Sequence, residues 1–346
     1  MTTSIWVVTD GAAGNERQAL ALARALAAPA DTAPGGVLAT ATTAAAPARS
    51  ASGEPRLWRL HARSPWRQAA PRRLPASERA FGDAFGLALA QPPRLAIGCG
   101  RLGALATRLL RAAGTRVVQI LDPRLPPDHW DVLVVPEHDR CRGANVITVL
   151  GSLHEVDAHW LANARQHSPA LATLPTPRTL LLLGGPIGNA PLDAPWWQRT
   201  LATLRAIHAR EGGSVSVCAS RRTPAWLMAA VRRALQTDAA PDGVIIPGIR
   251  WLDASDGENP YAGLLAHADR IVVSPDSVNM LSEAAATGAD VRIAGPELAR
   301  GKHAEFIASV LRLGAARPLL AQAHLQPTTA LHELPRVAAR ARAMLA

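Results

Sequence analysis

Short apolar runs alternate along this chain with longer segments in which apolar residues recur at helical spacing. The short runs are rich in valine, isoleucine and leucine, which predicts buried strands, and the longer segments predict amphipathic helices. Strands and helices in regular alternation are typical of a parallel sheet whose faces are covered by helices. The pattern therefore predicts an α/β protein.

The first half of the chain contains five strand candidates. They are residues 5–9, 57–61, 95–98, 116–121 and 132–135. The helical segments between them are residues 16–27, 77–90 and 102–113. These segments are long enough to serve as crossover connections between parallel strands. This half therefore predicts one doubly wound, Rossmann-like unit.

A second series of strand candidates follows in the other half. It comprises residues 179–183, 214–218, 244–246, 270–274 and 291–294. Helical segments again separate the strands, which predicts a second unit of the same kind. The expected fold is α/β, with two Rossmann-like, doubly wound domains that face a cleft.

The domain boundary is expected in residues 168–177, where three prolines interrupt the helical periodicity. We assign residues 1–170 to an N-terminal domain, the acceptor side, and 176–325 to a C-terminal domain, the nucleotide-sugar side. Residues 28–55, rich in Ala, Thr, Pro and Gly, predict a flexible surface insertion. The terminal segment 328–346 predicts an arginine-bearing amphipathic helix that packs on the N-terminal domain or lies on an anionic surface.

The composition of the 346 residues excludes wholesale disorder, because 48% are hydrophobic and 18% charged. The 37 basic residues exceed the 27 acidic ones by ten, and Lys302 is the sole lysine. Excess arginine suits phosphate-bearing substrates, an anionic membrane surface or nucleic acid, although a GC-rich genome produces the same excess. The arginines look dispersed and aromatic residues make up only 4%, so no nucleic acid partner is expected.

The three cysteines, Cys99, Cys141 and Cys218, lie far apart and form no CxxC pair. Neither a disulfide framework nor a zinc site is expected, which favours a reducing cytoplasm. The N-terminus lacks the pattern of a signal peptide, and no apolar run reaches the length of a membrane-spanning helix. We expect a cytoplasmic protein that can associate peripherally with the inner membrane.

The first strand candidate runs into a turn with Asp10 and Gly11, and Gly14 and Asn15 follow at the start of a helix. In parallel sheets ligands bind at such turns, because free N–H groups of the helix point into the crevice. These four residues are therefore candidate site residues. The alternative is a tight turn in which Asn15 is the helix N-cap.

A glycine-rich loop follows the strand candidate at 179–183. Gly184, Gly185 and Gly188 permit close approach of the backbone to a phosphate or sugar. Pro186 removes one N–H donor and no Lys-Ser or Lys-Thr pair follows, so the loop is not a Walker motif. The three glycines are expected to contact a nucleotide sugar.

The next strand candidate ends in the run Ser220, Arg221, Arg222 and Thr223, and Pro224 suits the first turn of a helix. Two guanidinium groups flanked by two hydroxyls at a strand exit are expected to clamp a diphosphate. The alternative is that the paired arginines only begin a solvated helix.

The most distinctive stretch is a strand followed by a polar turn with Asp276 and Ser277, and then a helix with Ser282 and Glu283. Hydroxyl-accepting groups at the N-cap and on the second turn lie where a ribose or hexose can sit. Helix capping accounts for Ser277 without a ligand. It does not account for Glu283 in an otherwise small and apolar helix.

Several motifs together resemble the family named after the plant mitochondrial fission factor of elongated-mitochondria mutants, with its bacterial members. In chain order they are DGxxGNxxQ (10–18), VVQILDPR (117–124), WDVLVVPEHD (130–139), GSLHEVD (151–157), GGPIGN (184–189), SRRTP (220–224) and SPDSVNMLSEAAATG (274–288). They span nearly the whole chain and are specific as a set. The strand, polar turn and SEAxxxG helix also resemble the nucleotide-sugar half of GT-B glycosyltransferases.

The resemblance implies a GT-B-like fold in which Glu283 binds the ribose of the donor and Arg221 and Arg222 hold its diphosphate. Bacterial members of the family look like glycosyltransferases. The plant member is an adaptor that brings a dynamin-like GTPase to the mitochondrial outer membrane, and we do not extend that role to this chain.

Glycosyl transfer to an acceptor hydroxyl needs a general base, and cations or helix termini to stabilise the departing diphosphate. His138, flanked by two acidic residues, is the first candidate base, followed by Asp10 and Asp122. A surface salt-bridge cluster explains the residues around His138 nearly as well. Arg124 is expected to line the cleft. No DxD motif is placed to hold a metal, so we expect neither a metal nor a cofactor.

The resulting hypothesis is a GT-B-type glycosyltransferase that uses a nucleoside-diphosphate sugar and acts on an envelope or lipid-linked acceptor at the inner leaflet. Two alternatives stay open. One is a non-catalytic adaptor or binding protein on the same scaffold, and the other is a nucleoside-diphosphate-sugar epimerase. The sequence leaves the nucleotide, the sugar, the acceptor and any protein partner unnamed.

Overall fold

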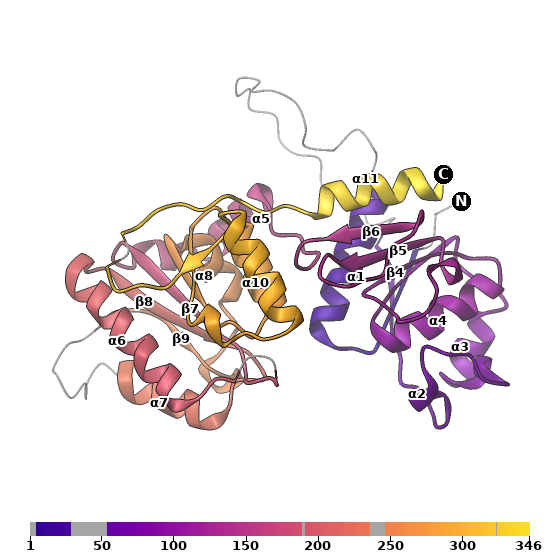
Figure 1. Ribbon diagram of the computed structural model, residues 1–346, viewed down its shortest axis with the longest axis horizontal. Helices are drawn as coiled ribbons and strands as arrows, with labels where there is room; N and C mark the ends of the chain where they lie inside the picture. The colour runs from indigo at the N-terminus through magenta and orange to yellow at the C-terminus, as the bar shows by residue number, and fades with distance from the viewer. Residues whose placement is uncertain (1–4, 29–53, 189–190, 236–245, 323) are drawn as a thin grey trace, which may run out of the picture. The chain divides into compact units, whose positions relative to one another are not determined.

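The computed structural model describes residues 5–28, 54–188, 191–235, 246–322 and 324–346. Contacts between residues divide the chain into two compact units (Figure 1). Unit 1 comprises Met1–His154 with Glu333–Ala346, and unit 2 comprises Glu155–His332. Each unit is built on a six-stranded parallel sheet, so the α/β, doubly wound prediction is confirmed.

The sheet of unit 1 has the strand order β2-β1-β3-β4-β5-β6. The strands are β1 (Ile5–Thr9), β2 (Arg56–Arg59), β3 (Leu95–Cys99), β4 (Arg116–Ile120), β5 (Val132–Pro136) and β6 (Val146–Val149). The helices are α1 (Ala13–Ala27), α2 (Trp66–Ala69), α3 (Asp83–Ala88), α4 (Gly100–Ala112) and α11 (Leu334–Leu345), with 3-10 helices η2 (Ser77–Arg79) and η3 (Pro127–His129).

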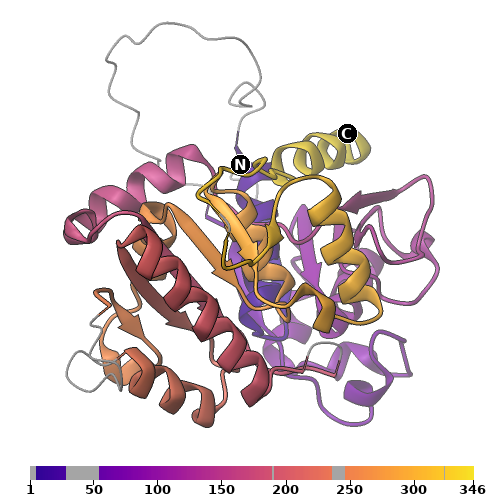
Figure 2. The same cartoon turned by 60° about the vertical axis from the view of Figure 1, so that its left-hand side comes forward.

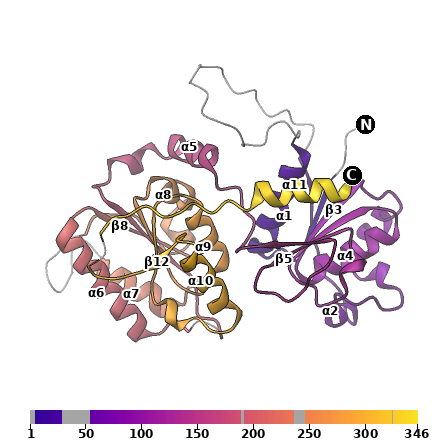
Figure 3. The same ribbon diagram turned by 45° about the horizontal axis from the view of Figure 1, so that its top comes forward.

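Helices cover both faces of this sheet. Alternate residues of each strand point to opposite faces, so each strand contributes side chains to two cores. In β1, Ile5 and Val7 pack in one core with residues of α1 and α11. Trp6 and Val8 pack in a second core with residues of α3 and α4. Figure 3 shows α11 beside α1. The continuous apolar run of β1 follows from this double burial.

The sheet of unit 2 has the strand order β12-β11-β10-β7-β8-β9. The strands are β7 (Arg178–Leu183), β8 (Ser214–Ala219), β9 (Arg250–Trp251), β10 (Arg270–Val273), β11 (Asp290–Ile293) and β12 (Arg317–Pro318). The helices are α5 (Ala158–His167), α6 (Ala194–Glu211), α7 (Ala225–Leu235), α8 (Tyr261–His267), α9 (Val278–Ala285) and α10 (Lys302–Arg312), with 3-10 helices η4 (Pro169–Thr173), η5 (Ala254–Asp256) and η6 (Pro296–Leu298). In Figure 2, α6 lies across the sheet, and its Trp196 and Trp197 pack in the core with β7 and β8.

The elements differ from the prediction at three places, and two further predictions fall largely outside the described residues. The short strands β6 and β12 complete the sheets and were not expected. The single helix predicted at 77–90 is wrong: η2 and α3 are separated by Gly82, whose φ of +84° is incompatible with a continuous helix. The strand predicted at 244–246 falls largely outside the described residues, and the edge strand is β9. The predicted insertion at 28–55 lies almost wholly outside them.

The units divide between His154 and Glu155, ahead of the 168–177 stretch in which a boundary is predicted. The physical reason is that α5 packs on α8 and therefore belongs to unit 2. Arg165 Nε on α5 donates a hydrogen bond to Ala266 O at 2.8 Å. The prolines mark the connection from η4 to β7 inside unit 2, not the change of unit.

The terminal helix α11 belongs by its contacts to unit 1. It packs on α1, β5 and β6 and buries Val337, Ala338 and Ala341. Arg336 Nη2 donates a hydrogen bond to Thr148 O at 2.7 Å. The apolar stripe of this helix is therefore covered by unit 1.

Two kinds of feature are missing from the described part of the chain. None of its helices combines the length and the hydropathy that crossing a membrane requires. Within the same residues, no group of three or more His, Cys, Asp or Glu side chains is placed to hold a metal ion.

Candidate functional site

In doubly wound sheets, ligands bind outside the carboxyl ends of the strands at the point where the strand order reverses. In unit 2 this switch point lies between β7 and β10, because β8 and β9 extend the sheet on one side and β11 and β12 on the other. In unit 1 it lies between β1 and β3. Most of the predicted site residues follow one of these four strands or an immediate neighbour.

Asp276 is the centre of a hydrogen-bond cluster at the switch point of unit 2, and its side chain has no exposed surface. Its Oδ1 accepts a hydrogen bond from Ser274 Oγ at 2.6 Å. Its Oδ2 accepts one from Gly185 N at 3.0 Å and one from Arg222 Nη2 at 2.7 Å. Ser274 Oγ in turn accepts from Gly184 N at 2.8 Å. The cluster joins the loops that follow β7, β8 and β10.

Two glycines of the loop after β7 are required by this packing. A Cβ on Gly184 would lie 2.0 Å from Asp276 Oδ2, and a Cβ on Gly185 would lie 2.0 Å from Arg222 O. At Gly188 no atom of the described residues lies within 4 Å of the Cβ position. The space that Gly184 and Gly185 provide is thus filled by the chain's own atoms, and only Gly188 faces open space.

The two adjacent arginines after β8 have different surroundings. Arg222 pairs with Asp276, and 49% of its side chain is exposed. Arg221 is exposed and has no polar partner among the described residues. A diphosphate at this edge would therefore meet one partly neutralised guanidinium and one uncompensated one, instead of the matched pair that the sequence predicts.

The hydroxyl groups beside these arginines hold the turn together. Thr223 Oγ1 is buried, donates to Gly184 O at 2.7 Å and accepts from Ser220 N at 3.0 Å. Ser220 Oγ accepts from Arg222 N at 3.2 Å. Both hydroxyls serve the turn itself, and their predicted contact with a diphosphate stays a prediction.

The helix α9 begins as its sequence predicts. Ser277 is the N-cap, and its side chain accepts a hydrogen bond from Met280 N at 3.3 Å. Ser282 Oγ donates back to Val278 O at 2.8 Å. Such bonds within the helix explain both serines without a ligand.

Glu283 on α9 is a buried carboxylate, with 4% of the residue exposed. It accepts a hydrogen bond from the hydroxyl of Tyr261, the sole tyrosine of the chain. Asn259 Oδ1 accepts from Tyr261 N at 2.9 Å and anchors that residue. A carboxylate in an apolar helix needs such a partner, because burial without one is costly.

Three residues of the unit 2 edge escaped the sequence-based prediction. Ser274 bonds Asp276, Tyr261 bonds Glu283, and His303 Nε2 lies 3.0 Å from Asp276 O. Two of these residues could have been identified from the sequence, because Ser274 directly follows a strand and Tyr261 is the sole tyrosine of the chain. No feature of the sequence identifies His303 as a site residue, because it reaches the edge from α10.

Asp10 organises the turn after β1 in unit 1. Its Oδ1 accepts hydrogen bonds from Ala12 N and Asn15 Nδ2, both at 3.0 Å. The alternative in which Asn15 is the N-cap is wrong, because Ala12 holds that position and its side chain makes no capping hydrogen bond. Gly11 has a φ of +78°, which favours glycine there, and Gly14 lies in the first turn of α1.

A G-x-G-x-x-G pattern, formed by Gly98, Gly100 and Gly103, ends β3 and opens α4. The pattern is visible in the sequence but escaped prediction, and its spacing is that of dinucleotide-binding folds. A Cβ on Gly100 would lie 2.6 Å from Asn15 Nδ2, and one on Gly103 would lie 2.7 Å from Val8 O. These glycines therefore serve close packing of α4 on the sheet.

Asp122, Arg124 and His138 follow β4 and β5 at the same edge of unit 1. Arg124 N donates to Asp122 Oδ1 at 2.7 Å, and Arg124 has a φ of +54°, which side-chain-bearing residues rarely adopt. Burial raises the pKa of Cys141, the Asp122 carboxylate raises it further, and so does Asp139. Asp122 is thus close enough to Cys141 to act on its pKa, and Cys141 lies in the loop that also carries the half-buried His138.

The predicted site residues therefore form two groups. The nucleotide-binding candidates of unit 2 converge on Asp276 and Glu283 at one edge of that unit. The candidate bases Asp10, Asp122 and His138 lie at the carboxyl edge of unit 1. The chemical roles given to both groups stay predictions.

The family model of mitochondrial fission ELM1 matches residues 13–345 of the chain. The chain belongs to this family. It is 28% identical over 255 residues to "Mitochondrial fission protein ELM1" of Arabidopsis thaliana, a match that covers 65% of this chain and 57% of that protein. It is 24% identical over 264 residues to the uncharacterized protein RP120 of Rickettsia prowazekii, with 65% of this chain and 72% of that one covered.

The ELM1-family chain also resembles solved structures. One is the crystal structure of MurG from Acinetobacter baumannii, with a TM-score of 0.46 and 14% sequence identity. The match covers 99% of this chain and 90% of that one.

Proposed function

We propose that this chain is a GT-B-type glycosyltransferase, which moves a sugar from a nucleoside-diphosphate sugar to an envelope or lipid-linked acceptor. The observation that supports this best is the convergence of three strand-end loops on Asp276 at the switch point of unit 2. The exposed Arg221 and the N-terminus of α9 stand at this edge, and both favour a diphosphate.

The proposed donor site uses unit 2 as follows. Arg221 and the exposed part of Arg222 stabilise the negative charge on the diphosphate as it departs. Gly188 lets the backbone of its loop approach the sugar, because its Cβ position is open. Glu283 accepts hydrogen bonds from the ribose hydroxyls, and Tyr261 holds its carboxylate in place.

In the proposed reaction the acceptor oxygen attacks the anomeric carbon of the sugar. The bond from that carbon to the diphosphate oxygen breaks, and the nucleoside diphosphate leaves with the electron pair. The acceptor proton passes to His138, with Asp10 and Asp122 as the alternative bases. Because the sequence has no DxD motif, arginines and a helix N-terminus, and no metal ion, stabilise the charge of the diphosphate in this reaction.

Thermal-shift measurements with UDP, GDP and ADP sugars test the donor site. One of them is expected to raise the melting temperature of the wild type. Glu283→Gln keeps the size of the side chain and removes its charge, so the Kd of that ligand should rise roughly 10- to 100-fold, as for loss of a hydrogen bond to a charged group. Glu305→Gln, an exposed position on α10, is the matched control and should bind as the wild type does. The donor assignment is wrong if no nucleotide sugar stabilises the protein.

A non-catalytic binding protein on this scaffold is the second candidate. It is favoured by the internal pairing of Arg222 with Asp276 and of Glu283 with Tyr261, since these groups are satisfied without a ligand. Radiolabelled donor separates the candidates. Transfer of label to a lipid extract supports the enzyme, binding without turnover supports the binding protein, and solvent-isotope exchange into the sugar without an acceptor supports an epimerase.

A further inference from the structure

One segment of unit 1 is rich in arginine and poor in acidic residues. Residues 56–94 contain eight arginines and only two acidic residues, a surplus of six out of the net charge of +10. The segment comprises β2 and the connection from β2 to β3, which includes α2 and α3; these two helices lie near α4 in Figure 1.

Five arginines of this segment form what we call the basic patch. They are Arg63, Arg67, Arg72, Arg73 and Arg79. All five are exposed, and none has a polar side-chain partner among the described residues. Arginines outside the patch often pair with carboxylates, as Arg59 of the same segment does with Glu16 at 2.8 Å. The patch therefore presents positive charge to its surroundings without internal compensation.

The backbone under the patch is held in place by two arginines of α4. Arg101 Nη2 donates a hydrogen bond to Ala70 O at 2.7 Å, and Arg108 Nη1 donates one to Pro71 O at 2.8 Å. Burial lowers the pKa of Arg108, and the neighbouring Arg73 lowers it further, while Asp128 opposes the shift. Like charges are thus brought together at this point, and an external anion would relieve their repulsion.

Two leucines of the same segment are exposed. Leu74 directly follows Arg73 and is 36% exposed, and Leu87 on α3 is 77% exposed, the largest value among the exposed apolar side chains of the described residues. Arginine with exposed leucine is the composition of surfaces that bind the interface of anionic membranes. The aromatic side chains of the segment are buried or half-buried, so they offer no platform for stacking nucleic acid bases.

We propose that unit 1 docks on an anionic membrane surface through the basic patch, with Leu74 and Leu87 reaching the apolar boundary of the lipid. The guanidinium groups pair with lipid phosphates, which supply the negative charge that the patch lacks. This inference does not rest on the proposed glycosyl transfer, because the patch and the unit 2 edge share no residue.

Co-sedimentation with vesicles tests the proposal without any nucleotide present. The wild type should bind vesicles that contain phosphatidylglycerol and not vesicles of phosphatidylcholine alone, and added salt should weaken binding. The variant R67Q/R72Q/R73Q should lose on the order of 100-fold in partitioning, since each arginine near an anionic surface contributes about 1 kcal/mol. The control R199Q/R233Q/R300Q removes the same charge from exposed, unpaired arginines of unit 2 and should retain binding.

A second variant separates the apolar contribution from the charge. L74S/L87S should keep the preference for anionic lipid but bind more weakly, with the difference persisting at high salt. Equal loss in the unit 2 control would overturn the proposal, because net charge alone would then explain binding. Binding of RNA or of an acidic polypeptide through the patch, with no vesicle binding, would also overturn it. Unchanged circular dichroism and melting temperature in each variant exclude misfolding as the cause.

Discussion

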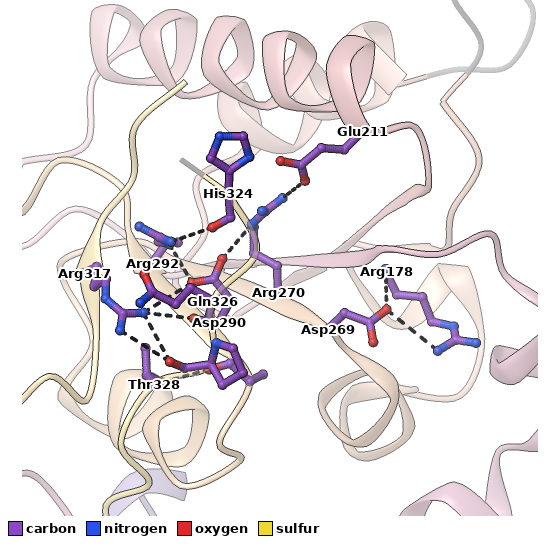
Figure 4. A network of polar contacts seen from close by, with 12 residues as sticks. Arg178, Glu211, Asp269, Arg270, Asp290, Arg292, Arg317, His324, Gln326 and Thr328 are labelled. Carbon is purple, nitrogen blue, oxygen red and sulfur yellow. Dashed lines mark hydrogen bonds and ion pairs between the residues drawn. The ribbon is translucent and has the colours of Figure 1, made fainter. Parts of the chain in front are cut away.

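Two groups of arginines in this molecule use the same side chain in opposite ways. In unit 2, Arg270 and Arg292 are buried against Asp290, with Nε to carboxylate distances of 3.0 Å and 2.7 Å (Figure 4). Arg270 also pairs with Glu211 at 2.9 Å. In unit 1, the arginines of the basic patch are exposed and unpaired.

The difference follows from where the charges stand relative to water. A buried guanidinium must be matched by carboxylates, because an uncompensated buried charge is strongly destabilising. An exposed one is solvated and contributes little to stability, so it remains available to an external anion. The buried group should therefore govern folding, and the exposed group should govern association.

The largest effect is expected at Arg270, whose side chain has no exposed surface. Arg270→Met leaves Glu211 and Asp290 short of a cation and should cost about 3–5 kcal/mol of unfolding free energy. Urea unfolding followed by circular dichroism measures this. Arg233→Met, on the exposed side of α7, is the control and should change stability by less than about 0.5 kcal/mol. Equal losses would remove the distinction between the two groups.

The next effect concerns the loop after β7, where two glycines differ in their surroundings. Gly184→Ala forces a Cβ to within 2.0 Å of the Asp276 carboxylate and should cost about 1–3 kcal/mol. Gly188→Ala meets open space and should be tolerated. Melting temperatures of the two variants compare them directly. A stable Gly184→Ala would mean that the Asp276 cluster is not the anchor of this edge.

A smaller, pH-dependent effect should come from Glu211. Burial raises its pKa, but hydrogen bonds from Arg210 and Arg270 outweigh burial and hold the pKa below the ordinary value of 4.5. Its contribution to stability is therefore complete above pH 4.5 and is lost as the pH falls through the lowered folded value. Acid titration of unfolding should be shallower in Glu211→Gln, and an unchanged slope would contradict this pairing.

The smallest effect on stability is expected in the basic patch. R67Q/R72Q/R73Q should change the unfolding free energy by less than about 0.5 kcal/mol per residue, because these side chains have no partner to lose. Differential scanning calorimetry measures this. A large destabilisation would show that the patch arginines stabilise the fold, as the buried arginines of unit 2 are expected to do.

Much of the fold could be predicted from the sequence, because strands that are buried on both faces are continuously apolar. The strand at Ile5–Thr9 has the predicted bounds. The strand β6 was not predicted, because it follows β5 after a short loop and no helix separates the two strands. Only some of the site residues could be predicted from the sequence. Residues such as Asp276 and Glu283 stood out by type, but their partners Arg222 and Tyr261 come from distant segments.

The sequence by itself determined the two doubly wound units, the glycine-bearing turns and the arginine surplus, because periodicity, turn chemistry and charge are local properties of the chain. Only the tertiary structure decided how these features are used. It showed that Asp276 fills the space beside Gly184, that Arg222 is already paired, and that the patch arginines are not. Pairing and burial depend on which distant segments a parallel sheet brings together, and that information lies in the packing of the elements and not in any single stretch of sequence.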